Sequence, residues 1–227
     1  MIDNKISIIT ICYENPKELE RTLKSIKSQI YSSFNYELII IDGSKSCKCQ
    51  RVANKYKDIV TILYNHTAKG IYNAMNKGLD FVTGETVLYM NSGDLISNTF
   101  CFSKFNKKLN HKVTNNIIFC DFKHRLDDLS FHISMKKIVQ EKSWWNRKLP
   151  SHQAVFMPAN YLKQNKFNED LKISADTLFL RSAFRQINSI YYNNVLCEFF
   201  LGGVSTYPKS VNDIIMHHRE LKITRNF

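Results

Sequence analysis

The 227-residue sequence has no long apolar run, although 44% of its residues are hydrophobic. No stretch approaches the roughly 18 uninterrupted apolar residues that a membrane-spanning helix needs. The start, MIDNKISIITICYEN, carries an acid at Asp3 and lacks the basic region and small-residue cleavage site of a signal peptide. These absences predict a cytoplasmic protein, and the length and composition are those of one globular domain over residues 1–227.

The sequence also lacks a cysteine pattern typical of a zinc site. Its six cysteines are scattered, and only Cys47 and Cys49 lie close together. A C-x-C pair with no second pair and no nearby histidine is poor zinc spacing. Several of the other cysteines lie within apolar, strand-like runs, so we expect buried or incidental thiols.

Two frequent nucleotide-binding signatures are missing as well. No G-x-G-x-x-G follows the first strand-like segment, and no G-x-x-x-x-G-K-[ST] occurs anywhere. The basic residues are not accompanied by an RNP, zinc-finger or helix-turn-helix signature. The net charge of +12 still predicts an anionic partner. Its dispersal along the chain favours a membrane surface or a phosphate ligand over specific nucleic acid.

The first half of the chain contains a regular alternation of strand and helix patterns. Short apolar runs predict strands at 6–12, 36–42, 59–64 and 86–90. Apolar residues at helical spacing predict helices over 15–30, 48–57 and 69–82. This order predicts an α/β fold with a Rossmann-like, mostly parallel sheet flanked by helices.

The second half is less regular. Helices are predicted over 99–110 and 173–187, and strands over 116–122, 151–158 and within 189–206. Residues 123–150 are basic and aromatic, with no clear periodicity, and the tail from 210 is basic and partly amphipathic.

Polar residues follow three of the predicted parallel strands, at 12–14, 42–44 and 91–94. Ligands of open α/β sheets bind beyond the carboxyl ends of the strands, so these residues form a candidate site. Ordinary turn chemistry is an alternative for each of them. Tyr13 is then a packing aromatic, Asp42 an Asx-turn residue, and Lys69 a solvated charge at the start of a helix.

Six segments in this order resemble glycosyltransferase family 2, which has the GT-A fold: SIITICYENPKELERTLKSIKSQ, YELIIIDGSKS, AKGIYNAMNKGLDFVTGETVLYMNSGD, SHQAVFMP, ISADTLFL and LGGVST. The resemblance covers nearly the whole chain and is strongest to the branch that builds bacterial capsule, O-antigen and colanic-acid-type polysaccharides. It implies that residues 1–97 bind a nucleotide sugar and that residues 98–227 form an acceptor-binding half with a basic tail.

The activity implied by this resemblance is that of an inverting, metal-dependent transferase of the hexosyltransferase type. The donor is a nucleoside diphosphate sugar, with UDP favoured over GDP, and the acceptor is a glycan or a lipid-linked diphosphate. The family also implies a peripheral position on the inner face of the cell membrane, where an anionic surface suits the positive charge.

The resemblance also implies which residues form the site. Asp176, which opens the late helix, matches the general base that deprotonates the acceptor hydroxyl. The residues that match the acceptor or diphosphate contacts are His152, Gln153, Gly202 and Gly203. The residues that match the nucleotide-sugar contacts are Thr10, Tyr13, Glu14, Asp42, Lys69, Gly70, Asn91 and Ser92.

The family's acidic metal motif is altered in this sequence. Asn91 stands in place of its first acid and Gly93 in place of the next, which leaves Asp94 alone. One carboxylate together with diphosphate oxygens can hold Mg²⁺ or Mn²⁺, so the resemblance still predicts a divalent metal at Asp94. His217 or His218 is either a further metal ligand or part of a solvated helix face.

The residues alone are also consistent with two other classes of protein. A sugar nucleotidyltransferase uses a similar sheet, but it usually has a glycine-rich loop after the first strand, and ICYENPKE contains no glycine. A basic nucleic-acid-binding module is the other alternative, and it predicts binding to DNA or RNA that weakens steeply with salt and has no sequence preference. That second alternative leaves the polar strand ends unexplained.

Overall fold

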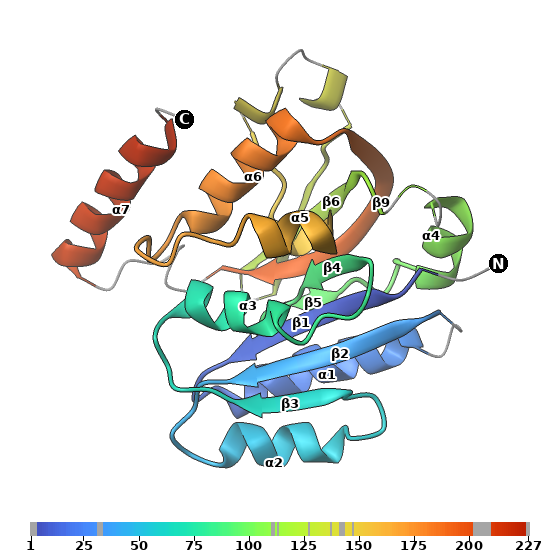
Figure 1. Cartoon of the computed structure of the whole chain (residues 1–227), viewed down its shortest axis with the longest axis vertical. Coiled ribbons are helices and arrows are strands. Elements are labelled where there is room, and N and C mark those ends of the chain that lie inside the picture. The colour runs from blue at the N-terminus through green and yellow to red at the C-terminus, as the bar shows by residue number, and fades with distance from the viewer. Residues whose placement is uncertain are drawn as a thin grey trace.

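The computed structural model of the chain describes residues 4–30, 34–109, 112, 114–126, 128–136, 138–140, 144–146, 148–201 and 210–225. In this part of the chain, nine strands form one sheet with the order β3-β2-β1-β4-β8-β6-β9-β5, and β7 pairs with β6 (Figure 1). The strands are β1 (Ile6–Cys12), β2 (Tyr36–Asp42), β3 (Ile62–Asn65), β4 (Thr86–Tyr89), β5 (Leu95–Ile96), β6 (Ile117–Leu126), β7 (Leu129–Ile133), β8 (Val155–Pro158) and β9 (Ser189–Phe200).

Helices connect and cover these strands. The α-helices are α1 (Pro16–Ile30), α2 (Lys48–Lys55), α3 (Ile71–Leu79), α4 (Phe102–Leu109), α5 (Ala159–Gln164), α6 (Ala175–Gln186) and α7 (Val211–Arg225). Short 3-10 turns cover Ile138–Gln140, Trp144–Asn146 and His152–Ala154. Among the helices that the structure describes, none has both the length and the apolar character needed to cross a bilayer.

The first half of the chain forms the parallel part of the sheet, β3-β2-β1-β4, which confirms the predicted strand and helix order. In Figure 1, α1 lies behind these strands and α3 lies in front of them. Gly78 of α3 packs so close to β1 that an added Cβ would lie 2.7 Å from Cγ2 of Ile9. The third strand begins later than predicted, because the backbone N–H groups of Ile59 and Val60 bond the Tyr56 carbonyl in a turn.

The second half extends the same sheet with mixed pairing. Strand β8 is antiparallel to both β4 and β6, while β6 and β9 are parallel and carry an irregularity between Cys120 and Phe122. The segment predicted as strands within 189–206 is one long strand up to Phe200. The predicted strand at 151–158 begins instead with the 3-10 turn. Elements β5, β7 and α5 were not predicted.

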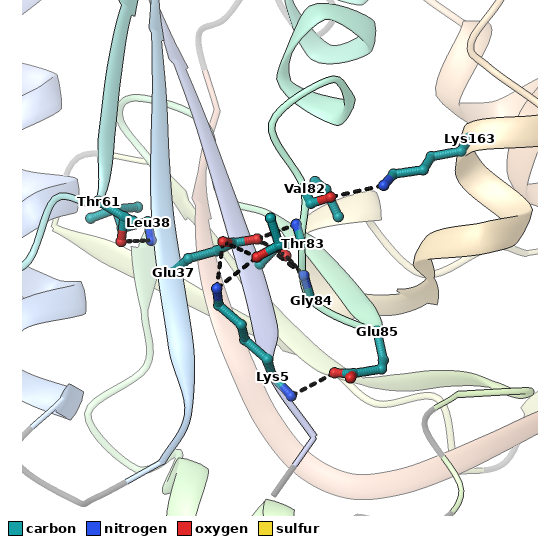
Figure 2. A network of polar contacts seen from close by, with 10 residues as sticks. Lys5, Glu37, Leu38, Thr61, Val82, Thr83, Gly84, Glu85 and Lys163 are labelled. Carbon is teal, nitrogen blue, oxygen red and sulfur yellow. Dashed lines mark hydrogen bonds and ion pairs between the residues drawn. The ribbon is translucent and has the colours of Figure 1, made fainter. Parts of the chain in front are cut away.

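A buried polar network lies at the amino ends of the parallel strands, away from the strand ends predicted to bind ligand (Figure 2). Glu37 of β2 has a side chain only 2% exposed, and it pairs with Lys5 at 2.8 Å. Its carboxylate also accepts hydrogen bonds from the Ser7 hydroxyl at 2.5 Å and from the Thr83 N–H at 2.7 Å. The network therefore joins β1, β2 and the turn before β4 through one carboxylate.

Candidate active site

A cavity of about 830 Å³ opens at the carboxyl ends of β1 and β4. Its wall comes from the end of β1, the starts of α1, α3 and α6, the turn after β4, the 3-10 turn before β8 and the end of β9. Both halves of the chain therefore contribute to one cavity at the sheet edge where the sequence predicted a site.

The turn after β4 carries Asn91, Ser92, Gly93 and Asp94 into this cavity. Gly93 adopts a φ of +110°, a conformation that glycine allows at no steric cost. The Thr22 hydroxyl of α1 accepts a bond from the Gly93 N–H at 2.9 Å and donates to the Asp94 carbonyl at 2.8 Å. The turn is thus held in a defined shape by α1.

The Asp94 carboxylate is buried at the base of this turn. Burial raises the pKa of Asp94 to about 7, against the opposing effect of a hydrogen bond from the Gln153 side-chain amide to Oδ2 at 2.8 Å. A carboxylate removed from water in this way is stabilised by a nearby positive charge.

Asp176 lies in the first turn of α6, and its side chain is 22% exposed toward the cavity. Oδ1 accepts bonds from the Tyr72 hydroxyl at 3.0 Å and the Thr177 N–H at 2.8 Å, and Oδ2 lies 2.7 Å from His152 Nδ1. Burial opposes ionisation of Asp176, but the contact with His152 and the other two bonds outweigh it and lower its pKa. The carboxylate is therefore ionised at neutral pH, as a general base must be.

Two consecutive residues, His152 and Gln153, connect Asp176 with the turn after β4. Gln153 donates to Asp94, and His152 Nε2 lies 3.2 Å from the Asn91 side-chain amide nitrogen. The Asn91 amide donates to His152 Nε2, which leaves Nδ1 as the nitrogen that donates to Asp176. The Asn91 oxygen Oδ1 then faces away from His152.

The turn has the oxygen donors that a hard divalent cation requires. Asn91 Oδ1 and Ser92 Oγ are buried and have no hydrogen-bond partner among the described residues, and Asp94 adds a carboxylate. Magnesium and manganese prefer oxygen ligands and combine few protein groups with phosphate oxygens. These residues therefore fit the predicted metal. Both His217 and His218 lie on α7, outside the cavity lining as far as the chain is described, so a histidine ligand stays a prediction.

Two more of the residues predicted to bind the nucleotide sugar, Tyr13 and Gly70, line the cavity. Tyr13 lines it with a ring that is 54% exposed. Gly70 also lines it, with a φ of +113° at the start of α3. Thr10 does not belong to the lining that the described residues form: it is fully buried in β1, and its hydroxyl has no partner within the described parts of the chain.

Three other predicted residues lie near the cavity but do not belong to its lining in the described chain. The Glu14 carboxylate accepts bonds from the Lys45 N–H at 2.7 Å and the Ser46 N–H at 2.9 Å. The buried Asp42 accepts from the Ser44 N–H at 2.9 Å, which is the Asx-turn arrangement. Lys69 is exposed. Gly202 and Gly203 lie outside the described residues.

The expectation of buried thiols holds for Cys12, Cys49, Cys120 and Cys197, whereas Cys47 is exposed. Cys12, Asp42 and Cys49 place their potential metal-binding atoms within 4.8 Å of one another. Burial raises the pKa of the Cys12 thiol, with the nearby Asp42 adding to the effect. A protonated thiol is a poor ligand, since metals bind the thiolate.

Sequence reasoning missed several residues that line the cavity. Tyr72, which donates to Asp176, lies two residues after Gly70 in the quoted motif AKGIYNAMNKGLDFVTGETVLYMNSGD, so its place there could have identified it. Arg21 of α1 has its guanidinium 4.7 Å from the Phe200 ring centroid. Phe200 comes from the end of β9, in a region without a local signal for a site.

A family model described as glycosyl transferase family 2 matches residues 7–187 of the chain. An uncharacterized glycosyltransferase of Mycobacterium tuberculosis is 25% identical over 208 residues, which cover 89% of this chain and 77% of the relative. A shorter match of 26% identity over 120 residues is to the Escherichia coli enzyme WfgD, named as a UDP-Glc:α-D-GlcNAc-diphosphoundecaprenol β-1,3-glucosyltransferase. It covers 52% of this chain and 45% of WfgD.

The fold is similar to that of S. aureus TarS. The TarS crystal structure in complex with UDP-GlcNAc aligns with a TM-score of 0.75 at 19% identity, covering 97% of this chain and 66% of the TarS chain. The chain spans 39% of a longer TarS chain. This similarity confirms the predicted GT-A fold.

Proposed function

The chain belongs to glycosyltransferase family 2, and we propose that it moves a sugar from a nucleoside diphosphate sugar to a glycan or lipid-linked acceptor, with inversion at the anomeric carbon. The observation that carries this proposal is the Asp176 carboxylate in a cavity that also contains the Asn91–Asp94 turn. The two are joined by the consecutive residues His152 and Gln153.

In the proposed reaction, Asp176 takes the proton of the acceptor hydroxyl. The resulting oxygen forms a bond to the anomeric carbon from the face opposite the leaving group, and the bond from that carbon to the diphosphate breaks. Tyr72 and Thr177 hold one carboxylate oxygen of Asp176, while His152 contacts the other. These contacts fix the orientation of the base toward the cavity.

The leaving diphosphate needs positive charge, because its negative charge grows as the bond breaks. A divalent cation bound there would supply that charge as a Lewis acid. Asp94 and Asn91 are the residues that would hold it, with the Ser92 hydroxyl beside them. The donor preference is UDP over GDP. The complex of TarS with UDP-GlcNAc supports a UDP-sugar for this fold.

The acceptor is proposed to be a surface-polysaccharide intermediate on the cytoplasmic face of the membrane. The partial similarity to WfgD, whose name specifies a diphosphoundecaprenol acceptor, supports a lipid-linked diphosphate. The net charge of +12 supports a position at an anionic surface.

The proposal is tested by incubating the protein with individual UDP- and GDP-sugars, Mn²⁺ or Mg²⁺, and synthetic lipid-diphosphate glycans. We expect release of the nucleoside diphosphate and a product one sugar heavier by mass spectrometry, with inverted anomeric configuration by NMR. A retained configuration would exclude the single-displacement mechanism. Formation of a nucleotide sugar from a sugar phosphate and a nucleoside triphosphate would indicate a nucleotidyltransferase instead.

Asp94→Ala is expected to remove most of the metal-dependent affinity for a nucleoside diphosphate, because Asp94 is the only carboxylate of the turn. Calorimetric titration with UDP, with and without Mn²⁺, measures this loss. The variant should fold, because the change removes a carboxyl whose burial opposes its ionisation. Asp58→Ala, at an exposed acid near α2, is the matched control. If the Mn²⁺-dependent affinity for UDP is unchanged in Asp94→Ala, the metal is bound by other residues.

Membrane binding is expected to involve α7, which exposes Ile214, Ile215 and Ile223 beside basic residues. Each Lys or Arg near an anionic leaflet contributes about 1 kcal/mol. Exchanging both Arg219 and Lys222 for Glu should therefore weaken binding to phosphatidylglycerol vesicles at low salt in a sedimentation assay.

The control for net charge is the double exchange Lys55→Glu and Lys57→Glu on the first half of the chain, which should leave vesicle binding nearly unchanged. High salt should release the wild-type protein from the vesicles, since screening weakens surface electrostatics. Equal binding to neutral phosphatidylcholine vesicles, or no binding at low salt, would contradict this location.

A further inference from the structure

The C-terminal helix α7 inserts one carboxylate beneath the loop that leads into α6. Glu220 is only 5% exposed. Its Oε1 accepts the Lys172 N–H at 2.6 Å, and its Oε2 accepts the N–H groups of Ile173 and Ser174, each at 2.9 Å. The Ser174 hydroxyl adds a further bond to Oε2 at 2.9 Å. One side chain thus holds three consecutive backbone N–H groups.

The loop that Glu220 holds connects directly to Asp176. Ile173 accepts a hydrogen bond at its carbonyl from the Tyr72 hydroxyl at 2.7 Å, and the same hydroxyl lies 3.0 Å from Asp176 Oδ1. Ser174 is the N-cap position of α6, two residues before Asp176. Any movement of this loop therefore changes both the start of α6 and the Tyr72 contact.

Only an ionised carboxylate suits this position. Burial opposes ionisation of Glu220, but the bonds from Lys172, Ile173 and Ser174 outweigh it and lower its pKa. A glutamine at 220 has one acceptor oxygen and one NH₂ group. Its NH₂ group would face at least one N–H donor of the loop, which leaves that buried donor without a partner.

We propose that Glu220 is a positioning residue for the sugar transfer, because it fixes residues 172–174 and, through Ile173 and Tyr72, the orientation of the Asp176 carboxylate. The inference rests on the proposed function. It assigns to α7, which otherwise lies outside the cavity in the described chain, a direct part in holding the active site. A second contact, from the Arg181 guanidinium of α6 to the Thr224 carbonyl of α7, holds the same two helices together.

The test compares Glu220→Gln with Glu37→Gln, a matched change at a buried glutamate at the other end of the sheet. Glu220→Gln should lower kcat about tenfold or more, as expected when a catalytic group is misplaced. Its calorimetric affinity for UDP should stay within about twofold of wild type, because the change acts on the base and not on donor binding. Glu37→Gln should lower stability and leave kcat unchanged.

Hydrogen exchange supplies a readout that does not need activity. The amides of Ile173 and Ser174 should exchange faster in Glu220→Gln than in wild type, and at the wild-type rate in Glu37→Gln under conditions where both variants are folded. If the wild-type protein transfers no sugar, the proposed function fails, and the exchange rates alone decide whether Glu220 holds the loop.

Two results would overturn the proposal. One is a Glu220→Gln protein with normal kcat and normal exchange at residues 172–174. The other is a parallel loss of kcat and UDP affinity, which indicates general damage to the fold. If Glu220→Gln does not fold, Ser174→Ala removes only the hydroxyl bond. It should then show a smaller fall in kcat at unchanged UDP affinity, and normal kcat in that variant would also overturn the proposal.

Discussion

Asp176→Asn is expected to lower turnover about a hundredfold or more, which is the usual range for loss of a general base. The amide has the shape of the carboxylate but cannot take the proton of the acceptor hydroxyl. The affinity for the donor should remain nearly intact, because a base acts in the transition state and contributes little to ground-state binding. Steady-state transfer assays measure the first effect, and calorimetry with UDP measures the second.

Asp170→Asn is the matched control for this variant, since Asp170 is an exposed acid six residues earlier, in the loop that precedes α6. It should leave turnover unchanged. The thermal unfolding of both proteins shows whether the exchange at Asp176 has affected the fold. Near-normal transfer by a folded Asp176→Asn protein would mean that another residue is the base.

Glu37→Gln is expected to lower the free energy of unfolding by about 3 kcal/mol at neutral pH. Burial opposes ionisation of Glu37, yet hydrogen bonds from Lys5, Ser7 and Thr83 outweigh it and lower its pKa from 4.5 to about 2. Because the folded-state pKa is lowered, this contribution to stability is present above pH 4.5 and is lost as the pH falls toward 2. Glutamine resembles the protonated acid and loses the contribution at every pH.

The difference in unfolding free energy between wild type and Glu37→Gln should therefore shrink as the pH falls from about 4.5 to about 2, as followed by urea denaturation. Glu20→Gln is the control, because the pair of Glu20 with Lys55 at 3.5 Å is exposed, and such pairs contribute about 1 kcal/mol or less. A pH-independent difference would show that the Glu37 charge is not the origin of the effect.

The parallel part of the sheet and the edge that carries the candidate site were predictable because their signals are local. The apolar run up to Tyr89 predicts a strand, and the polar residues from Asn91 to Asp94 directly after it predict a turn at the strand's carboxyl end. Both inferences need only neighbouring residues, together with the rule that parallel strands bring their carboxyl ends together. The role of Asp176 was predicted from the resemblance of the segment ISADTLFL to glycosyltransferase family 2.

The rest of the site depends on contacts between distant residues. The two-residue strand Leu95–Ile96 pairs with β9, about a hundred positions later, and no local pattern marks so short a strand. The contact between Gln153 and Asp94 arises because β8 pairs antiparallel with β4, which brings the residues before β8 beside the turn after β4. Glu220 lies in a tail whose sequence is mainly basic, so its buried position could not be inferred from composition.

The antiparallel pairing of β4 with β8 limits how this protein can change during evolution. Thr86 lies opposite Pro158 and Leu88 lies opposite Phe156, so the chain leaving β4 runs past the chain entering β8. Adding or deleting one residue between Thr86 and Asp94, or between His152 and Pro158, would reverse which side chains face the cavity, since neighbours along a strand point to opposite sides. Point substitutions leave this alignment intact. Natural variants should therefore differ around the cavity by substitution, while the chain length from Thr86 to Asp94 and from His152 to Pro158 stays constant.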